Sequence, residues 1–452
     1  MALATQAPGP VTPLGDDRGS SHRTIALGSS PFGSTLPGVI AAIAFGAACL
    51  VWLTAGNQLP GGRWIVVHIF TLGVLTTLIW TFSKHFAARF TATTSLASRP
   101  ATATAATILL VGSIVTMLAG RALHAHLPLA LGSVGIMIVV GSNLLVLRRH
   151  RRNATATRFV WIVRQYEHAH IAFIAAAALG GALGAGWLPG SMFVAARNAH
   201  IHLNVLGWAG LTVLATLAAF GPALLRVRIA PNADTRAATG MHAATLGLWV
   251  TTAGYLVTGL SGDAGPLRLL TVGGLVAYGY GLVTVAGPLL RASRTTARSP
   301  MRWALAASLI WFLVAIAVDI IMVASGSPGW SQELAAMLLV GVLAQLVLAV
   351  LSYVGPMLRG RDLATRDRLI ARVERLARLR SATFNLGVVL LVGAHVLPRL
   401  TGAPVERAGW IVVAAATIAQ LGSLLWPTGT PDPDRVYSVT AARYRPPPRE
   451  PE

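Results

Sequence analysis

The chain consists mainly of apolar runs of about 20 residues, separated by short polar stretches. A helix needs about 20 apolar residues to cross the hydrocarbon core of a bilayer, so each run predicts a membrane-spanning helix. The predicted fold is therefore an all-α integral membrane protein with twelve transmembrane helices. The spans are expected near residues 37–55, 64–83, 103–120, 129–147, 170–188, 201–220, 241–260, 267–290, 303–324, 335–355, 382–398 and 409–426.

Arginine and lysine gather in alternate loops of this pattern. The loops after the second, fourth, sixth, eighth and tenth spans hold 24 Lys and Arg residues, whereas the other six loops hold six. Because basic residues favour the cytoplasmic side, we expect a multi-pass protein of the cell inner (cytoplasmic) membrane with both termini in the cytoplasm. Residues 1–35 and 427–452 are polar and rich in Pro, which predicts disordered cytoplasmic tails around a membrane domain at residues 36–426.

One sequence frame recurs at a constant interval. Segments 68–73 and 202–207 share the spacing of their His, Leu and Gly residues, and Gly341 follows Gly207 at the same distance along the chain as Gly207 follows Gly73. The third copy has Ala336 in place of the histidine. Self-similarity at a fixed period indicates a chain built from repeated units. We therefore expect three pseudo-symmetric four-helix blocks, at about residues 36–160, 161–300 and 301–426.

The composition agrees with a membrane protein. Hydrophobic residues make up 54% of the 452 residues and charged residues 11%, against roughly a quarter in soluble domains. The net charge of +21 could indicate nucleic-acid binding. The basic residues lie between apolar runs, however, so we expect the lipid bilayer as the partner and no nucleic acid. Cys49 is the only cysteine, which excludes disulfides within the chain, Cys-ligated zinc and iron–sulfur clusters.

Three histidines are predicted to lie at one depth, near the outer face of the membrane. His68 and His202 are near the starts of inward-running spans, and His395 is late in an outward-running span. Ionisable groups within a membrane are costly and mark functional sites, and neutral imidazole binds haem iron, copper and zinc. We therefore take these three residues as candidate cofactor ligands that meet in one pocket. The alternative for each is a hydrogen bond to a neighbouring helix.

Four further residues are candidate metal ligands. His200 points about 200° away from His202 on a regular helix, so we expect it at the entrance or in support of the other ligands. His124 and His126 have the spacing of a surface copper or zinc site, the alternative being exposed loop histidines. Asp319 is one of only two acids expected in or against the spans, where it could ligate a metal, accept protons or pair with arginine.

The polar segments on the predicted cytoplasmic side are expected to face water. Residues 360–380 predict an amphipathic helix that is either a solvated connector or a surface for the membrane or a partner. Four histidines are expected at cytoplasmic helix ends, namely His150, His168, His170 and His242.

This architecture resembles the haem–copper oxidase subunit I superfamily, whose fold is twelve helices in three pseudo-symmetric arcs, with inward histidines on helices 2, 6 and 10. The resemblance covers about residues 36–426 and is specific at His68–Gly73 and His200–Trp208. The second segment, His-x-His-Leu-Asn-x-Leu-Gly-Trp, is similar to runs in cbb3-like relatives and in nitric-oxide-response membrane proteins that bind haem and copper. The second and sixth spans are closer still to the membrane domain of some bacterial multicopper oxidase and copper nitrite reductase fusions.

The resemblance implies a haem- and/or copper-binding protein of respiratory or nitrogen-oxide metabolism, in electron transfer or metal handling. It would exchange electrons with quinol or with a cupredoxin or cytochrome partner. The family's haem-ligating histidines of helix 10 and its His-His pair of helix 7 have no counterpart here, so no complete oxygen-reducing centre is expected. For a bound haem, the resemblance carries over His68 as a ligand. That His395 or His202 would substitute as its partner is our own inference and not a pattern of the family.

Two alternatives from other functional classes stay open. One is a cofactor-free transporter or channel for a small solute or copper, because repeated helical blocks around a central cavity also suit transport. The other is a membrane anchor subunit for a separate cupredoxin enzyme.

Overall fold

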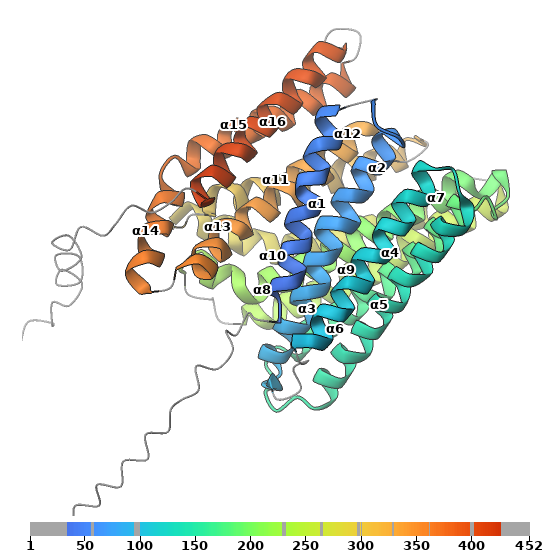
Figure 1. Ribbon diagram of the computed structural model, residues 1–452. Coiled ribbons are helices and arrows are strands. Elements are labelled where there is room, and N and C mark those ends of the chain that lie inside the picture. The colour runs from blue at the N-terminus through green and yellow to red at the C-terminus, as the bar shows by residue number, and fades with distance from the viewer. Residues whose placement is uncertain are drawn as a thin grey trace, which may run out of the picture.

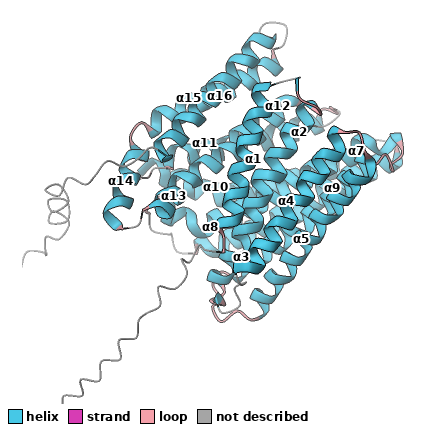
Figure 2. Cartoon of the chain, viewed as in Figure 1, coloured by secondary structure: helices cyan, strands magenta, loops and turns pink. Residues whose placement is uncertain are grey.

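Every regular element of the described chain is a helix (Figure 1). The computed structural model describes residues 34–55, 58–94, 100–227, 232–262, 265–295, 299, 301–327, 330–360, 362–397 and 402–425. Figure 2 shows helices throughout, and no strand occurs within these ranges. The predicted all-α fold is therefore confirmed. The two predicted tails lie outside the described residues, apart from Ser34 and Thr35.

Most of the long helices are uninterrupted. They are α1 (Leu36–Ala55), α4 (Pro100–Ala122), α5 (His126–Arg152), α6 (Val160–Gly184), α9 (Ala233–Ser261), α10 (Arg268–Thr295), α11 (Arg302–Ala324), α15 (Ala377–Val396) and α16 (Gly402–Leu425). A 3₁₀ turn, η4 (Gly190–Met192), precedes α7, and α14 (Leu363–Glu374) links α13 to α15.

Three long helices are compound, with a π-helical segment between two α-helical ones. These are α2 (Gly62–His68), η2 (Ile69–Thr76) and α3 (Thr77–Phe90); α7 (Phe193–His202), η5 (Leu203–Leu211) and α8 (Thr212–Leu224); and α12 (Gln332–Ala335), η6 (Ala336–Ala344) and α13 (Gln345–Arg359).

Within the described ranges, eleven helical units are long and apolar enough to cross a membrane. This supports a multi-pass membrane protein in a lipid bilayer. Of the twelve predicted spans, the one not among these eleven is α6, which has 25 residues. It begins at Val160 rather than near residue 170, and its first turns carry Arg164 and Glu167. The hydropathy pattern did not predict this polar start, because charged residues lower the mean hydropathy of a segment even where neighbouring helices cover it.

The three π-helical segments begin at Ile69, Leu203 and Ala336, which are nearly evenly spaced along the chain. A π-helical segment disturbs the regular backbone hydrogen bonds of a helix and frequently occurs at functional sites. In η5, the Tyr278 hydroxyl donates to the Leu206 carbonyl at 2.9 Å. The same local irregularity thus recurs at the interval of the sequence repeat.

Each compound helix packs against the helix that precedes it in the chain. The contacts are η2 on α1, η5 on α6 and η6 on α11. The contact of η2 with α1 lies at Gly73, where an added methyl group would collide with the Phe45 ring. Gly207 and Gly341 lie at the corresponding contacts of η5 and η6. The other long helices pair with their sequence neighbours, α4 with α5, α9 with α10 and α15 with α16.

The helices α9 and α10 approach until backbone meets backbone. A methyl group added to Gly274 would lie 2.5 Å from the Thr251 nitrogen, and one added to Gly247 would lie 2.6 Å from the Tyr278 nitrogen. Small residues permit this distance, and van der Waals packing is a main source of helix association in a bilayer. The pair therefore depends on having no side chain at these two positions.

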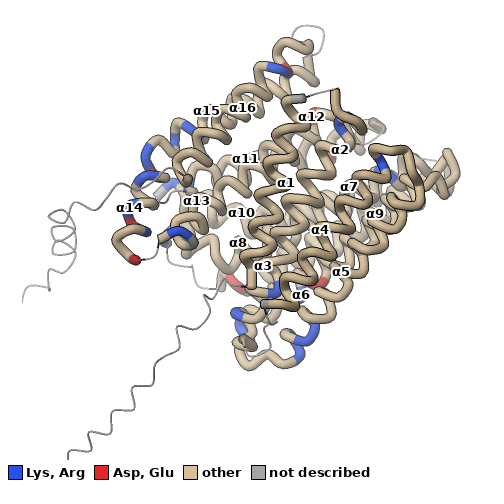
Figure 3. The backbone as a smooth tube through the Cα atoms, viewed as in Figure 1, with Lys and Arg blue, Asp and Glu red and all other residues tan. Residues whose placement is uncertain are grey.

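Charged side chains lie chiefly toward the helix ends (Figure 3). One basic group closes α5, from Arg148 to Arg152, and another occupies α14 and the beginning of α15. The predicted amphipathic helix across residues 360–380 is broken, since α14 ends at Glu374 and Leu376 adopts a left-handed φ of 62°. The basic segment is therefore a short helix followed by a turn into α15.

The start of α14 provides a pH-dependent prediction. The Asp362 carboxylate accepts hydrogen bonds from the backbone nitrogen of Thr365 at 2.7 Å and from its hydroxyl at 2.9 Å, and these bonds lower the pKa of Asp362 below its ordinary value of 3.8. A lowered pKa means that the cap stabilises α14 above pH 3.8 and is lost as pH falls through the folded pKa.

Asp362→Ala is therefore expected to speed amide hydrogen exchange in α14 at neutral pH, with the difference from the parent protein shrinking in acid. The control is Asp367→Ala, which removes the same charge from the helix interior. Equal acceleration in both variants would contradict a capping role.

Candidate functional site

His68 lies beside His200. The two residues come from separate compound helices, because His68 ends α2 and His200 lies near the end of α7. Their ring centres are 6.5 Å apart and their planes differ by 23°. His68 also stacks on Trp64, with ring centres 3.7 Å apart. Both histidines are half-buried.

Backbone hydrogen bonds set the same tautomer in the two rings. Nδ1 of His68 donates to the Trp64 carbonyl at 2.8 Å, and Nδ1 of His200 donates to the Ala176 carbonyl at 2.7 Å. Because a carbonyl only accepts, each neutral ring carries its hydrogen on Nδ1 and keeps the lone pair on Nε2. Metal-binding histidines show this pattern, in which one nitrogen is held and the other is directed at the metal.

The position of the His200 ring depends on α6. At Gly180 of α6 an added methyl group would lie 2.5 Å from Cε1 of His200, so only glycine leaves room for the ring. Asn204, one turn further along, donates to the His200 carbonyl at 2.9 Å and, over a longer 3.4 Å, to Nε2, so an ion bound at Nε2 would have to displace this second bond. His200 and His202 do face different neighbours, as predicted. It is His200 that faces His68.

The distance between the two ring centres is the observation that bears on a shared ion. An ion about 2 Å from each of two Nε2 atoms holds the ring centres about 6 Å apart, close to the 6.5 Å between these rings. Imidazole suits copper, whereas structural zinc takes four ligands. Among the described residues no three His, Cys, Asp or Glu side chains gather around one point.

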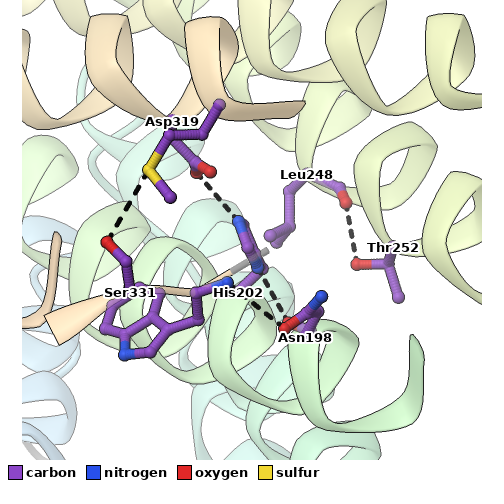
Figure 4. Close-up of polar contacts among 8 residues, drawn as sticks. Asn198, His202, Leu248, Thr252, Asp319 and Ser331 are labelled. Carbon is purple, nitrogen blue, oxygen red and sulfur yellow. Dashed lines mark hydrogen bonds and ion pairs between the residues drawn. The ribbon is translucent and has the colours of Figure 1, made fainter. Parts of the chain in front are cut away.

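His202 is held by a different partner, Asp319 (Figure 4). Nε2 of His202 lies 2.9 Å from Oδ2 of Asp319, and the two side chains are 1% and 2% exposed. Nδ1 of His202 donates to the Asn198 carbonyl at 2.8 Å. The bond to Asp319 therefore contains a second proton, donated either by the ring or by the carboxyl group. Both ring nitrogens are engaged, which leaves no lone pair on His202 for a metal.

Aromatic side chains surround this pair. The Tyr255 ring centre is 4.9 Å from that of His202, and the Trp330 ring centre is 6.2 Å from it. The backbone nitrogen of Trp330 donates to the Asn198 side chain at 3.4 Å. The buried Tyr255 hydroxyl has no hydrogen-bond partner among the described residues. The pair thus joins α7 to α11 inside a mainly apolar shell.

His395 lies apart from the other predicted ligands. It is on α15, with Nε2 4.0 Å from Oε1 of Glu406 on α16, and Arg63 binds the same carboxylate at 2.9 Å. The structure brings His68 to His200 and His202 to Asp319. Among the described residues it does not gather His68, His202 and His395 into one group of ligands.

His124 and His126 lie at the turn between α4 and α5, and both are exposed. His124 has a left-handed φ of 54° and His126 is the first residue of α5. A surface metal site at this turn stays a prediction.

His170 is fully buried, so its predicted place at a water-exposed helix end is wrong. Its Nδ1 donates to the Tyr166 carbonyl at 2.7 Å, and Nε2 accepts from the Asn143 amide at 2.9 Å. The same amide lies 3.2 Å from the Ser83 hydroxyl. The early start of α6 is the reason, because it puts His170 about three turns into the helix.

Two further residues at this end are also buried against expectation. Glu167 is 6% exposed and pairs with Arg151 at 2.6 Å, so Asp319 is not one of only two acids against the spans. His150 is 2% exposed and its Nδ1 lies 2.7 Å from the Thr93 hydroxyl. Arg151 and Glu167 have opposite charges and flank one turn between consecutive helices, which is the sequence signal that could have suggested this pair.

Comparison of the chain with protein-family models, with curated proteins and with solved structures finds no match.

Proposed function

We propose that this chain is a copper-binding membrane protein of respiratory or nitrogen-oxide metabolism that acts in electron transfer or metal handling. The observation that carries the proposal is the His68–His200 pair, with ring centres 6.5 Å apart and both Nδ1 atoms held by carbonyls. Copper bound by the two Nε2 atoms would supply one-electron chemistry. Quinol and a cupredoxin or cytochrome are the electron partners that this chemistry would use.

The scaffold in this proposal is three four-helix blocks arranged as in the haem–copper oxidase subunit I superfamily. Its support is the recurrence of one pattern along the chain. A π-helical segment begins at Ile69, at Leu203 and again at Ala336, nearly evenly spaced, and each one packs on the preceding helix. The basic helix ends, placed on the cytoplasmic side, would put the His68–His200 pair toward the outer face of the membrane.

Metal analysis tests the proposal. The detergent-solubilised full chain, loaded with copper under reducing conditions, is expected to bind one ion per chain by elemental analysis. Because removal of a supporting residue alone costs metal sites about 10–100-fold in affinity, His68→Ala and His200→Ala should each cost at least about 100-fold. The control is His395→Ala, which should bind copper as the parent protein does.

An absorption spectrum of the same membranes separates the other outcomes. A Soret band that disappears in His68→Ala would show that this site binds haem and not copper. Copper binding that survives both His68→Ala and His200→Ala would overturn the proposed site.

A cofactor-free transporter is the second candidate function. The observation that favours it is the buried His202–Asp319 pair beside the Tyr255 hydroxyl, which is unpartnered among the described residues, because polar groups within a bundle often line ion or solute paths. Absence of both copper and a Soret band would favour this candidate or a membrane anchor over metal binding.

A further inference from the structure

The basic end of the bundle contains a cavity with an apolar floor. It lies where the turn between α14 and α15 meets α16, and its volume is about 450 Å³. The helices α15 and α16 lie side by side at one edge of the molecule, with α14 at one end of the pair (Figure 1). The cavity is lined by Arg372, Arg375, Leu376, Leu379, Arg380, Thr383, Ala415, Ala416, Ala419 and Ser423.

The cavity faces the surroundings of the bundle rather than its core. In the most apolar stretch of α15 and of α16, 28% of the residues are buried. In that of the compound helix that contains α7, 67% are buried. Leu376 and Leu379 are 61% and 60% exposed at the cavity. The α16 wall presents small side chains at Ala415 and Ala419, so a groove remains open between the two helices.

The charge at this cavity has one sign. Arg372, Arg375 and Arg380 line it, and no acidic residue is among its described lining residues. Arg380 has a structural role, because its Nε donates to the Gln420 side chain at 2.6 Å and its Nη1 to the Arg375 carbonyl at 2.8 Å. These bonds anchor the α14–α15 turn to α16 and so hold the other two arginines at the cavity.

We propose that this cavity binds an anionic phospholipid, with the phosphate at Arg372 and Arg375 and an acyl chain along the groove between α15 and α16. Charge complementarity selects the headgroup, and the exposed leucines and alanines suit hydrocarbon. Basic pockets between membrane helices bind anionic lipid headgroups in this way. The site is separate from the His68–His200 pair and does not depend on the proposed function.

Native mass spectrometry of the full chain in detergent tests this proposal, with titration by phosphatidylglycerol and by phosphatidylcholine. We expect phosphatidylglycerol to bind tighter by about ten-fold or more. The double variant Arg372→Gln/Arg375→Gln should lose roughly thirty-fold in phosphatidylglycerol affinity, because each basic residue near an anionic lipid contributes about 1 kcal/mol and 1.4 kcal/mol is ten-fold.

Two further variants make the test specific. Arg149→Gln/Arg152→Gln removes the same charge from two exposed arginines at the end of α5 and should leave the affinity unchanged. Ala419→Trp fills the groove from an exposed position, and should reduce binding while the arginines remain. Equal affinity for the two lipids, or equal losses in the two double arginine variants, would overturn the proposal. Monodisperse elution of each variant confirms that it folds.

Discussion

Replacement of Asp319 by leucine is expected to lower the free energy of unfolding by about 3–5 kcal/mol, the cost of removing one partner of a buried ion pair. The variant leaves the His202 ring, 1% exposed, without the partner that its Nε2 now has at 2.9 Å. The rings of Tyr255 and Trp330 lie against His202 and offer its Nε2 no replacement acceptor in the described structure. Thermal or denaturant unfolding of the detergent-solubilised protein measures the loss.

The double variant His202→Leu/Asp319→Leu separates pairing from packing. Removing both polar groups leaves no unpaired nitrogen, so the double variant should regain much of the stability lost in Asp319→Leu. The single variant His202→Leu completes the cycle. If the losses of the two single variants simply add in the double variant, the bond between His202 and Asp319 is not the cause. The double variant should still bind copper as the parent protein does, because His68 and His200 are unchanged.

Gly274→Leu is expected to cost about 3 kcal/mol or more of stability, because overpacking a tight contact typically costs about 1–3 kcal/mol and this one meets backbone. The Thr251 nitrogen lies 2.5 Å from the position of an added methyl group, and backbone atoms of α9 cannot move aside without separating the helices. The yield of folded protein and its thermal midpoint measure the effect.

The adjacent residue provides a matched control. Gly273 is exposed, and an added methyl group there meets nothing within 4 Å. Gly273→Leu makes the same chemical change one position away and should stay close to the parent protein. Because leucine has a higher helix propensity than glycine, propensity cannot explain a loss, and comparable damage from both variants would contradict the contact between α9 and α10 as its cause.

Local properties of the sequence were enough to predict that the chain is helical and where most of its helices lie. An apolar run of about 20 residues has to form a helix in a bilayer, because no other single segment satisfies its own backbone there. That rule predicted the all-α fold and most helix positions. It missed the start of α6, since burial of Arg151 against Glu167 makes a polar segment part of the bundle.

The partners of the polar side chains depended on contacts between distant segments. The sequence by itself determined an all-helical membrane protein with a frame that recurs at a constant interval, and it singled out His68, His200, His202 and Asp319 as residues of interest. Only the tertiary structure decided that His68 meets His200 and that His202 meets Asp319. The physical reason is that hydropathy and period describe one helix at a time, whereas the neighbour of each face is set by packing between helices that lie far apart in the chain.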